Sequence, residues 1–207
     1  MTQGQQENVI AGPPVDYSFR DLKNALDIVY EAPVSGTARC LPIKSDVNLN
    51  EHLETLPTPR SPVKAGHRIL NSNSLRICNN LLISLQGLGK VLPHVLDDPR
   101  ELVWLDASCN QLASIEDIIT EYPKLQVLYL HGNQIRHMTE IQKLAKLEHL
   151  TKLTLHGNPI TEQKNYKLYV AAHLPKLRSL DFSTITKIDR EKTEVWFRGY
   201  QKQMADK

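Results

Sequence analysis

Apolar residues in the second half of this chain recur in a pattern that combines strand-like and turn-like spacing. Its clearest copy is residues 125–135, LQVLYLHGNQI, which reads L-x-x-L-x-L-x-x-N-x-I. Leu128 and Leu130 alternate along a short strand, so both side chains point to one face. Gly132 and Asn133 then turn the chain, and the Asn133 amide offers two donors and an acceptor to backbone groups that the turn leaves unpaired. The stretch predicts one strand-and-turn unit with a buried asparagine.

The same pattern recurs along the chain, with asparagine again at the turn. The asparagines at 110, 133 and 158 have the period of about 20–29 residues that is typical of leucine-rich repeats. The first and last copies are degenerate, as the ends of a capped repeat array should be. We therefore predict an α/β fold: a short leucine-rich repeat solenoid of about five rungs, with a parallel concave sheet, helical or 3-10 turns on the convex side, and a C-terminal helical cap. The copies are Ser72, Leu75, Ile77, Asn80, Leu82; Leu102, Leu105, Ala107, Asn110, Leu112; Leu125, Leu128, Leu130, Asn133, Ile135; Leu150, Leu153, Leu155, Asn158, Ile160; and Leu177, Leu180, Phe182, Ile185.

Helical spacing between and after the repeats predicts the rest of this domain. Apolar residues at 88, 91, 92, 95 and 96 predict a helix in the long first unit, and a step of three from 135 to 150 predicts helical or 3-10 turns on the convex side. The repeats are expected to occupy residues 70–160. Residues 161–207 are expected to form a cap and a terminal helix that hide the sheet edge. The apolar positions that mark these two helices are Tyr166, Tyr169, Val170, Leu174, Ile188, Val195, Trp196 and Tyr200.

The N-terminal region is predicted to be separate from the repeats. Residues 1–33 contain a short amphipathic helix, with Ser18 and Asp21 placed as its N-terminal cap, and residues 34–69 form a proline-containing linker whose stiffest part is TPRSP. A helix this short does not persist unpacked in water. Its apolar face, Phe19, Leu22, Leu26 and Val29, is therefore expected to bind a partner in trans. The alternative is a lid that docks in cis against residues 75–96.

The concave face is the expected binding surface of such a solenoid. Residues that alternate with the buried leucines line it, and strands about 4.8 Å apart give five rungs a span of ~20 Å, enough for one helix or one extended segment. Trp104 and Tyr129 fall centrally on adjacent rungs, where large aromatics ringed by charge are typical of interface anchors. The alternative is that a terminal segment of the same chain covers them. The predicted partner-binding residues of this face are Arg76, Trp104, Asp106, Val127, Tyr129, His131, Lys152, Thr154 and His156.

The composition excludes several classes of function. The chain of 207 residues has 23% charged residues and a net charge of +2, which gives no nucleic-acid footprint over the whole chain. It has no run of 18 apolar residues, and the polar N-terminus predicts no signal peptide. Three cysteines without paired spacing favour a reducing, intracellular compartment. We expect no membrane association and no small-molecule substrate.

No constellation of catalytic or metal-binding residues emerges. His131 and His156 share a column with Cys78, but Ser108 intervenes and a zinc site needs three or four converging ligands. Asp106 and Asp181 lie three rungs apart, ~14 Å, which is too far for a pair of catalytic carboxylates. The phosphate-binding and nucleophile-elbow motifs are absent. The sequence predicts a protein without enzymatic activity, metal or cofactor.

The repeats resemble the short intracellular leucine-rich repeat family, which includes the nuclear regulator of protein phosphatase 1, the spliceosomal A-prime protein and axonemal dynein light chain 1. Residues 156–191 are similar to the C-terminal cap of that family. Four stretches, PPVDYSFRDL, VLYLHGNQI, LTLHGNPI and DFSTITKIDREKTEVW, resemble one subgroup associated with motile cilia. The matching cap residues are Asn158, Pro159, Tyr166, Tyr169, Val170, Leu174, Pro175, Leu177, Leu180, Asp181 and Arg190.

This resemblance implies a non-catalytic scaffold for protein–protein interaction, in the cytoplasm and the axoneme of motile cilia, with protein partners in a large cytoskeletal assembly. The alternative is a soluble adaptor subunit of a phosphatase or ribonucleoprotein complex. Salt-sensitive RNA binding by the basic C-terminal segment would favour the ribonucleoprotein role.

Overall fold

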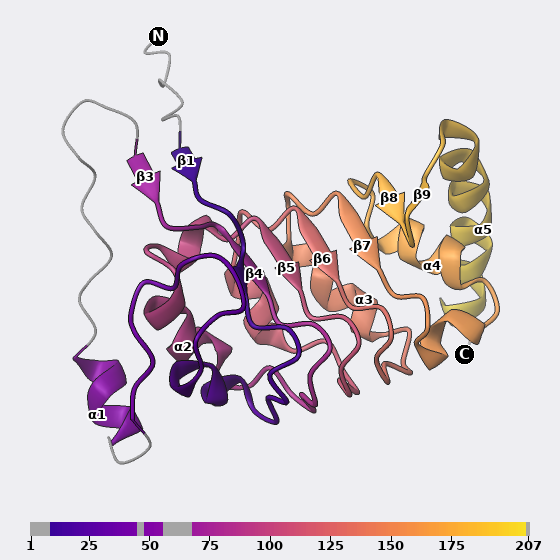
Figure 1. Ribbon diagram of the computed structural model, residues 1–207. Coiled ribbons are helices and arrows are strands. Elements are labelled where there is room, and N and C mark those ends of the chain that lie inside the picture. The colour runs from indigo at the N-terminus through magenta and orange to yellow at the C-terminus, as the bar shows by residue number, and fades with distance from the viewer. Residues whose placement is uncertain (1–8, 45–47, 56–67, 206–207) are drawn as a thin grey trace, which may run out of the picture.

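The computed structural model describes residues 9–44, 48–55 and 68–205 (Figure 1). Its main feature is one sheet in the strand order β2-β4-β5-β6-β7-β8-β9, parallel from β2 to β8, with β9 antiparallel at the end. A second, two-stranded parallel sheet pairs β1 with β3. The strands are β1 Val9–Ala11, β2 Val15–Asp16, β3 Arg68–Leu70, β4 Ser74–Arg76, β5 Trp104–Asp106, β6 Val127–Tyr129, β7 Lys152–Thr154, β8 Ser179–Leu180 and β9 Ser183–Thr184.

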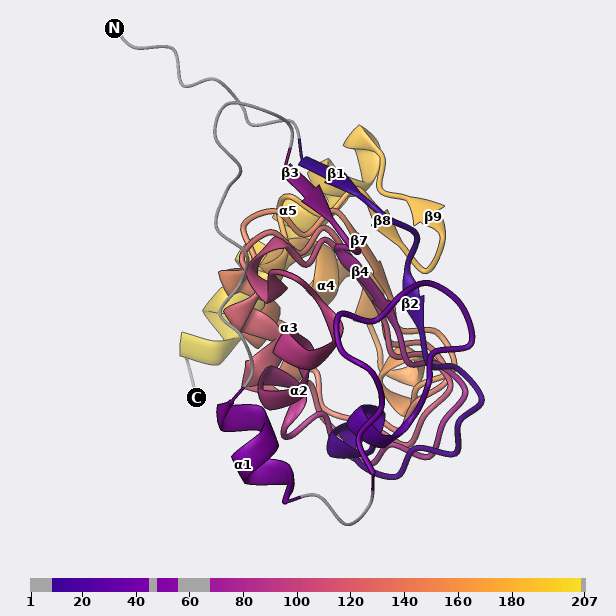
Figure 2. The same cartoon turned by 60° about the vertical axis from the view of Figure 1, so that its left-hand side comes forward.

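The helices lie on one side of this sheet, so the molecule is a two-layer solenoid (Figures 1 and 2). The leucines at the centre of each strand pair directly with one another, from Leu75 through Leu105 and Leu128 to Leu153, and all are buried under the helices. The sequence prediction of the fold is confirmed. The helices and 3-10 turns are η1 Ala25–Tyr30, α1 Leu49–Glu54, α2 Leu88–Val95, η2 Pro99–Glu101, η3 Asp117–Glu121, α3 Glu140–Lys143, η4 Leu144–Lys146, η5 Pro159–Glu162, α4 Tyr166–His173 and α5 Lys187–Ala205.

The repeat asparagines form a buried ladder along the turns. The Asn133 amide donates to the carbonyl oxygens of Leu130 (2.9 Å) and Ala107 (3.1 Å), and its Oδ1 accepts from the backbone N–H of Leu112 (3.0 Å). Gly132 precedes it at φ +66°, a conformation that strains most other residues. Asn133 therefore satisfies backbone groups of its own rung and of the rung before it, as the pattern predicts. Asn80, Asn110 and Asn158 make equivalent bonds and are likewise buried.

The N-terminal segment is a further rung of the solenoid, which corrects the prediction of a separate helix. Val15 pairs with Leu75 in the sheet, and Val15 and Tyr17 are fully buried. Asn80 Oδ1 accepts from the backbone N–H groups of Arg20 (2.9 Å) and Leu22 (3.2 Å). Residues 15–22 thus repeat the strand and turn of the pattern, with arginine in place of asparagine.

The element directly after this rung is a short 3-10 helix, η1. Asn24 and Asp27 cap it, so the predicted cap at Ser18 and Asp21 was wrong. Ser18 instead donates to the Asp16 carboxylate, and Asp21 has φ +52°. Leu22 and Val29 are buried in the core of the chain, so this segment docks in cis as a lid. The prediction that they bind a partner in trans was therefore wrong. Leu26 is half-buried, and Phe19 alone of the predicted face is largely exposed.

Part of the predicted linker is also ordered against the first repeat. Asp16 and Ser35 form an antiparallel bridge that covers the edge of β2. The backbone N–H groups of Arg39 and Cys40 donate to carbonyls at the end of α2, each at 2.9 Å. These contacts satisfy carbonyls that a helix C-terminus otherwise leaves unpaired. The TPRSP stretch lies outside the described residues.

The C-terminal cap closes the other end. Strand β8 turns back through Asp181 and Phe182 into β9, and α5 packs along α4. Arg190 donates to the carbonyl oxygens of Ala171 (2.5 Å), Leu174 (3.3 Å) and Leu177 at the end of α4. The predicted terminal helix is present, but Ile188 and Val195 on it are exposed.

Candidate protein-binding surface

An aromatic cluster occupies the centre of the concave face. The sheet places Trp104 on β5 and Tyr129 on β6, and their ring centroids are 5.8 Å apart in a T-shaped arrangement. Phe182 from the β8–β9 turn meets Tyr129 edge to face at 5.6 Å. Edge-to-face pairs of this kind stabilise by about 0.5–1.5 kcal/mol beyond the area they bury. The cluster of Trp104, Tyr129 and Phe182 is therefore held in shape before any partner binds.

Arg76 forms the N-terminal border of the cluster. Its guanidinium lies over the Trp104 ring, 5.3 Å from the centroid. Two carboxylates hold it there, since Asp16 lies 3.3 Å from Nη1 and Asp106 lies 3.8 Å from Nε. One face of the Trp104 ring is therefore covered by a cation. Ser108 in turn donates to Asp106 through its backbone N–H and its hydroxyl group.

Two histidines form the opposite border. The rings of His131 and His156 are stacked, with centroids 4.5 Å apart, and Phe182 contacts both. His131 Nδ1 lies 2.9 Å from the Thr154 hydroxyl group. Burial, followed by the nearby His156, lowers the pKa of His131 below its ordinary value. His131 therefore stays neutral at pH 7.

Phe182 is exposed because of an unusual turn. The two residues between β8 and β9, Asp181 and Phe182, have φ values of +50° and +61°. A two-residue hairpin with both values positive normally contains Asn-Gly or Asp-Gly, because a bulky side chain is strained there. The Asp181 carboxylate fixes the turn: it accepts from the backbone N–H groups of Leu155 (2.6 Å) and His156 (2.8 Å) and from the Tyr166 hydroxyl group (3.0 Å). The result is a phenylalanine that is 65% exposed on the concave face.

The structure brings most of the predicted residues together, but it gives some of them a different role. Arg76, Trp104, Tyr129, His131 and His156 form one continuous set of contacts. Lys152 is exposed beside them and Val127 is half-buried. Asp106 and Thr154 were predicted to bind a partner, but both are buried and bonded to neighbouring side chains, so the structure gives them a positioning role.

Phe182 was not among the predicted site residues. It was placed at a buried leucine position of the last repeat, but the turn swings it onto the concave face. The pair Asp-Phe carries no turn signal that the sequence could have revealed. Asp16 was also missed, because the segment 16–30 was predicted to be a helix with Ser18 as its N-terminal cap rather than part of a rung.

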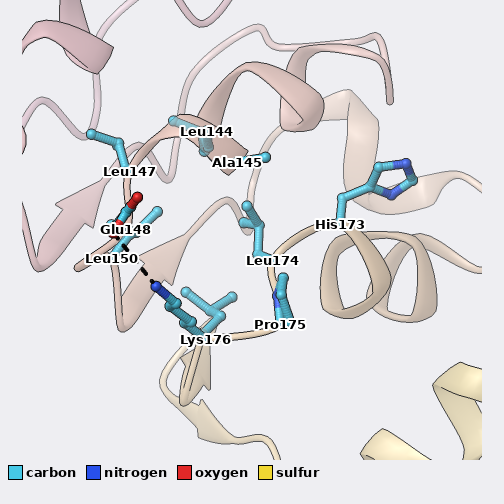
Figure 3. Close-up of a pocket in the computed structure, with 10 residues that line it drawn as sticks. Leu144, Ala145, Leu147, Glu148, Leu150, His173, Leu174, Pro175 and Lys176 are labelled. Atoms are coloured by element: carbon cyan, nitrogen blue, oxygen red, sulfur yellow. Dashed lines mark ion pairs between the residues drawn. The ribbon is translucent and has the colours of Figure 1, made fainter.

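A separate apolar pocket lies behind the sheet, between η4 and the end of α4 (Figure 3). It measures about 220 Å³ and is lined mainly by leucines, with Leu144, Leu147 and Leu174 among them. Glu148 and Lys176 form an ion pair of 3.8 Å at its edge. Its lining contains His173 and these two charged residues but no cluster resembling an active site.

Across the described residues, no group of three or more His, Cys, Asp or Glu side chains could hold a metal ion. No helix among them is long and apolar enough to cross a membrane.

Comparison with known proteins identifies the family. A leucine-rich repeat family model matches residues 100–207. Leucine-rich repeat-containing protein 51 of Macaca mulatta is 41% identical over 186 residues, which cover 90% of this chain and 85% of the relative. The human protein of that name is 40% identical over the same shares of both chains. The chain belongs to the leucine-rich repeat-containing protein 51 family.

Structural similarity confirms the fold of this member of the leucine-rich repeat-containing protein 51 family. One chain of the crystal structure of the Drosophila melanogaster SNF/U2A′ complex is 20% identical, with a TM-score of 0.57 over 89% of this chain and 98% of that chain. A probable U2 small nuclear ribonucleoprotein A′ of Caenorhabditis elegans is 37% identical over 83 residues, 40% of this chain and 33% of the relative. Leucine-rich repeat domains are typically non-catalytic modules for protein interaction, and the geometry of the concave face agrees with that role.

Proposed function

We propose that this chain is a non-catalytic scaffold whose concave face binds a protein partner, and that it acts as a structural component of the motile-cilium axoneme. The observation that carries the proposal is the ordered cluster of Trp104, Tyr129 and Phe182 on an open sheet face. Aromatic residues at the centre of a concave patch are typical binding hot spots, because they bury a large apolar area with little loss of side-chain entropy. Trp104 and Tyr129 are half-buried and Phe182 is exposed, so part of the cluster faces solvent.

The axonemal part of the proposal has a different support. It rests on the resemblance of four stretches of the sequence to a subgroup associated with motile cilia. The most specific of them, residues 13–22, forms the first rung of the solenoid and contributes Asp16 to the border of the aromatic cluster. A partner shared within the subgroup would therefore contact a surface that this stretch helps to build.

The alternative function is a soluble adaptor of a ribonucleoprotein or phosphatase complex. The similarity to the Caenorhabditis elegans protein over 83 residues favours the ribonucleoprotein form of this alternative. It predicts that the protein copurifies with RNA rather than with axonemal proteins.

Affinity purification from ciliated cells tests the proposal. Tagged chain should copurify with axonemal proteins, and the double variant Trp104→Ala/Tyr129→Ala should lose them, because truncating hot-spot aromatics costs about 2 kcal/mol or more. The matched control is Ile188→Ala/Val195→Ala, which truncates two exposed apolar residues of α5. Equal recovery of partners by both double variants would reject the concave site, and recovery of RNA in place of axonemal proteins would favour the adaptor.

A further inference from the structure

We propose that the concave surface selects an acidic segment of its protein partner, with an apolar residue on the aromatic cluster and carboxylates on a cationic rim formed by Lys152 and Arg178. This inference rests on the proposed function and adds the chemistry of the partner to it.

The rim carries two cations that have no counter-charge among the described residues. Lys152 begins β7 and pairs with Ser179 of β8. Arg178 directly precedes β8, and its backbone N–H donates to the carbonyl oxygen of Thr151, the residue before Lys152 (2.7 Å). Both side chains are exposed, and neither makes an ion pair with any residue that the structure describes. Other cations at the same end of the strands are paired: Lys124 lies 2.8 Å from Glu101, and Lys176 lies 3.8 Å from Glu148. The rim is thus a local positive site beside the cluster.

The surface next to the rim is hollow and also positive. A depression of about 800 Å³ is lined by Arg178, Lys176 and Arg190, with Glu148 as the one carboxylate in its lining. A cation near a carboxylate at a partly desolvated interface gives a charge-assisted hydrogen bond of about twice the strength of a neutral one. An acidic residue of the partner would therefore bind most favourably at this position, and a basic residue would be repelled.

The spacing between cluster and rim suits a single peptide segment. In the sheet, Val127 separates Trp104 from Lys152, so two strand spacings, about 10 Å, lie between them. Seven residues of a helix rise about 10.5 Å, and three residues of an extended chain span about the same distance. One helix or strand can therefore place an apolar anchor on the cluster and an acidic residue on the rim.

A protein segment suits this surface better than single-stranded RNA. Bases bind aromatic platforms by stacking on open ring faces. Here Arg76 covers one face of Trp104, and Tyr129 meets both Trp104 and Phe182 edge to face. The rings therefore present a packed, uneven apolar surface that suits aliphatic or aromatic side chains more than a run of parallel bases.

Selection from a random peptide display library against the full chain tests the inference. Enriched peptides should carry Asp or Glu a few residues from Leu, Phe or Trp, and their Kd should rise as salt increases. The double variant Lys152→Glu/Arg178→Glu should weaken binding of a selected peptide by about tenfold or more. The control Lys23→Glu/Lys90→Glu makes the same change in net charge beside η1 and on α2, and it should change Kd by less than about twofold.

The outcomes separate this inference from the proposed function. Peptides that need Trp104 and Tyr129 but show no acidic preference would overturn the acidic segment and leave the concave site standing. Acidic peptides that bind the Trp104→Ala/Tyr129→Ala variant with unchanged Kd would rule out the concave site itself. A failure to enrich any peptide would also overturn the inference. So would a labelled 20-nucleotide single-stranded RNA that binds more tightly than the selected peptides and loses its binding in the rim variant.

Discussion

Phe182 combines a strained backbone with an exposed aromatic ring. Its backbone lies in a left-handed conformation that costs a residue with a β-carbon about 1–2 kcal/mol, and its ring is largely exposed. Strained backbone that persists in a folded protein is common where a side chain must be presented to a ligand. The Asp181 carboxylate and the contacts of the ring with Tyr129 and the two histidines hold Phe182 in place.

Two substitutions separate the backbone strain from the loss of the ring. Phe182→Gly and Phe182→Ala both remove the aromatic contacts, but only glycine adopts the turn without strain. We expect the glycine variant to be more stable than the alanine variant by about 1 kcal/mol. Urea unfolding of both variants measures this difference. An alanine variant that is equally stable or more stable would contradict the assigned turn.

Asn133 is the clearest test of the asparagine ladder. Replacing Asn133 by alanine leaves the buried backbone N–H of Leu112 without its partner and removes one of the two amide donors to the carbonyl groups of Ala107 and Leu130. We expect a loss of ~1–3 kcal/mol. The matched control is Gln134→Ala, the next residue along the chain, which is exposed. A thermal melt in which both variants match the parent would refute the register of the repeats.

His131 should make the stability of the protein depend on pH. Its pKa in the folded chain lies below the ordinary value of 6.5, so the unfolded chain binds the proton more tightly. The stability that neutral His131 provides is therefore present above about pH 6.5 and is lost as the pH falls through the folded pKa. Between pH 7.5 and pH 5.5, His131→Gln should lose less stability than the parent, whereas His137→Gln, at an exposed position, should behave like the parent. Identical pH profiles for parent and His131→Gln would exclude this linkage.

At the scale of elements, the N-terminal rung changes the view of where the domain begins. Val15, Tyr17 and Leu22 complete the core against the first repeat, and the bridge to Ser35 covers the sheet edge. A solenoid needs such a terminal unit, because an uncovered end exposes apolar surface and unpaired backbone groups.

Leu22 tests whether this rung is part of the fold. Leu22→Ala removes a buried side chain and should destabilise the chain by about 2–5 kcal/mol, whereas Leu41→Ala, at a position that is 85% exposed, should stay within about 0.5 kcal/mol of the parent. Denaturant unfolding compares the two. Equal stability of both variants would show that residues 15–22 do not pack on the repeats, and would restore partner docking.

The sequence predicted the rungs, the inward leucines, the asparagine ladder and the columns of the concave face, because each depends on a local spacing that recurs. It did not predict the N-terminal rung. There Val15, Tyr17 and Leu22 keep the spacing of the repeat, but Arg20 replaces the asparagine, and helical spacing within residues 19–30 favoured the other interpretation. Nor could it predict Phe182, whose exposure depends on bonds from Asp181 to Leu155 and His156 on the preceding rung.

At the scale of the whole molecule, the described structure divides its surfaces by function. One face of the sheet packs on the helices and supplies stability, and terminal elements close both ends. The concave face presents a rigid aromatic cluster bordered by Arg76 and by the stacked histidines. Because the rings already contact one another, a partner would bind with little further ordering of side chains, which favours affinity. We therefore expect a partner to bind this face and not the exposed residues of α5.

Site-specific photo-crosslinking tests this central claim most directly. A photoreactive phenylalanine analogue placed at Tyr129 should crosslink the tagged chain to one defined partner protein in ciliated cells, and the adduct should fractionate with the axoneme. The same analogue at Ile188, an exposed position on α5, should give no such adduct. Abundant adducts from Ile188 and none from Tyr129 would contradict the claim that the concave face is the binding surface.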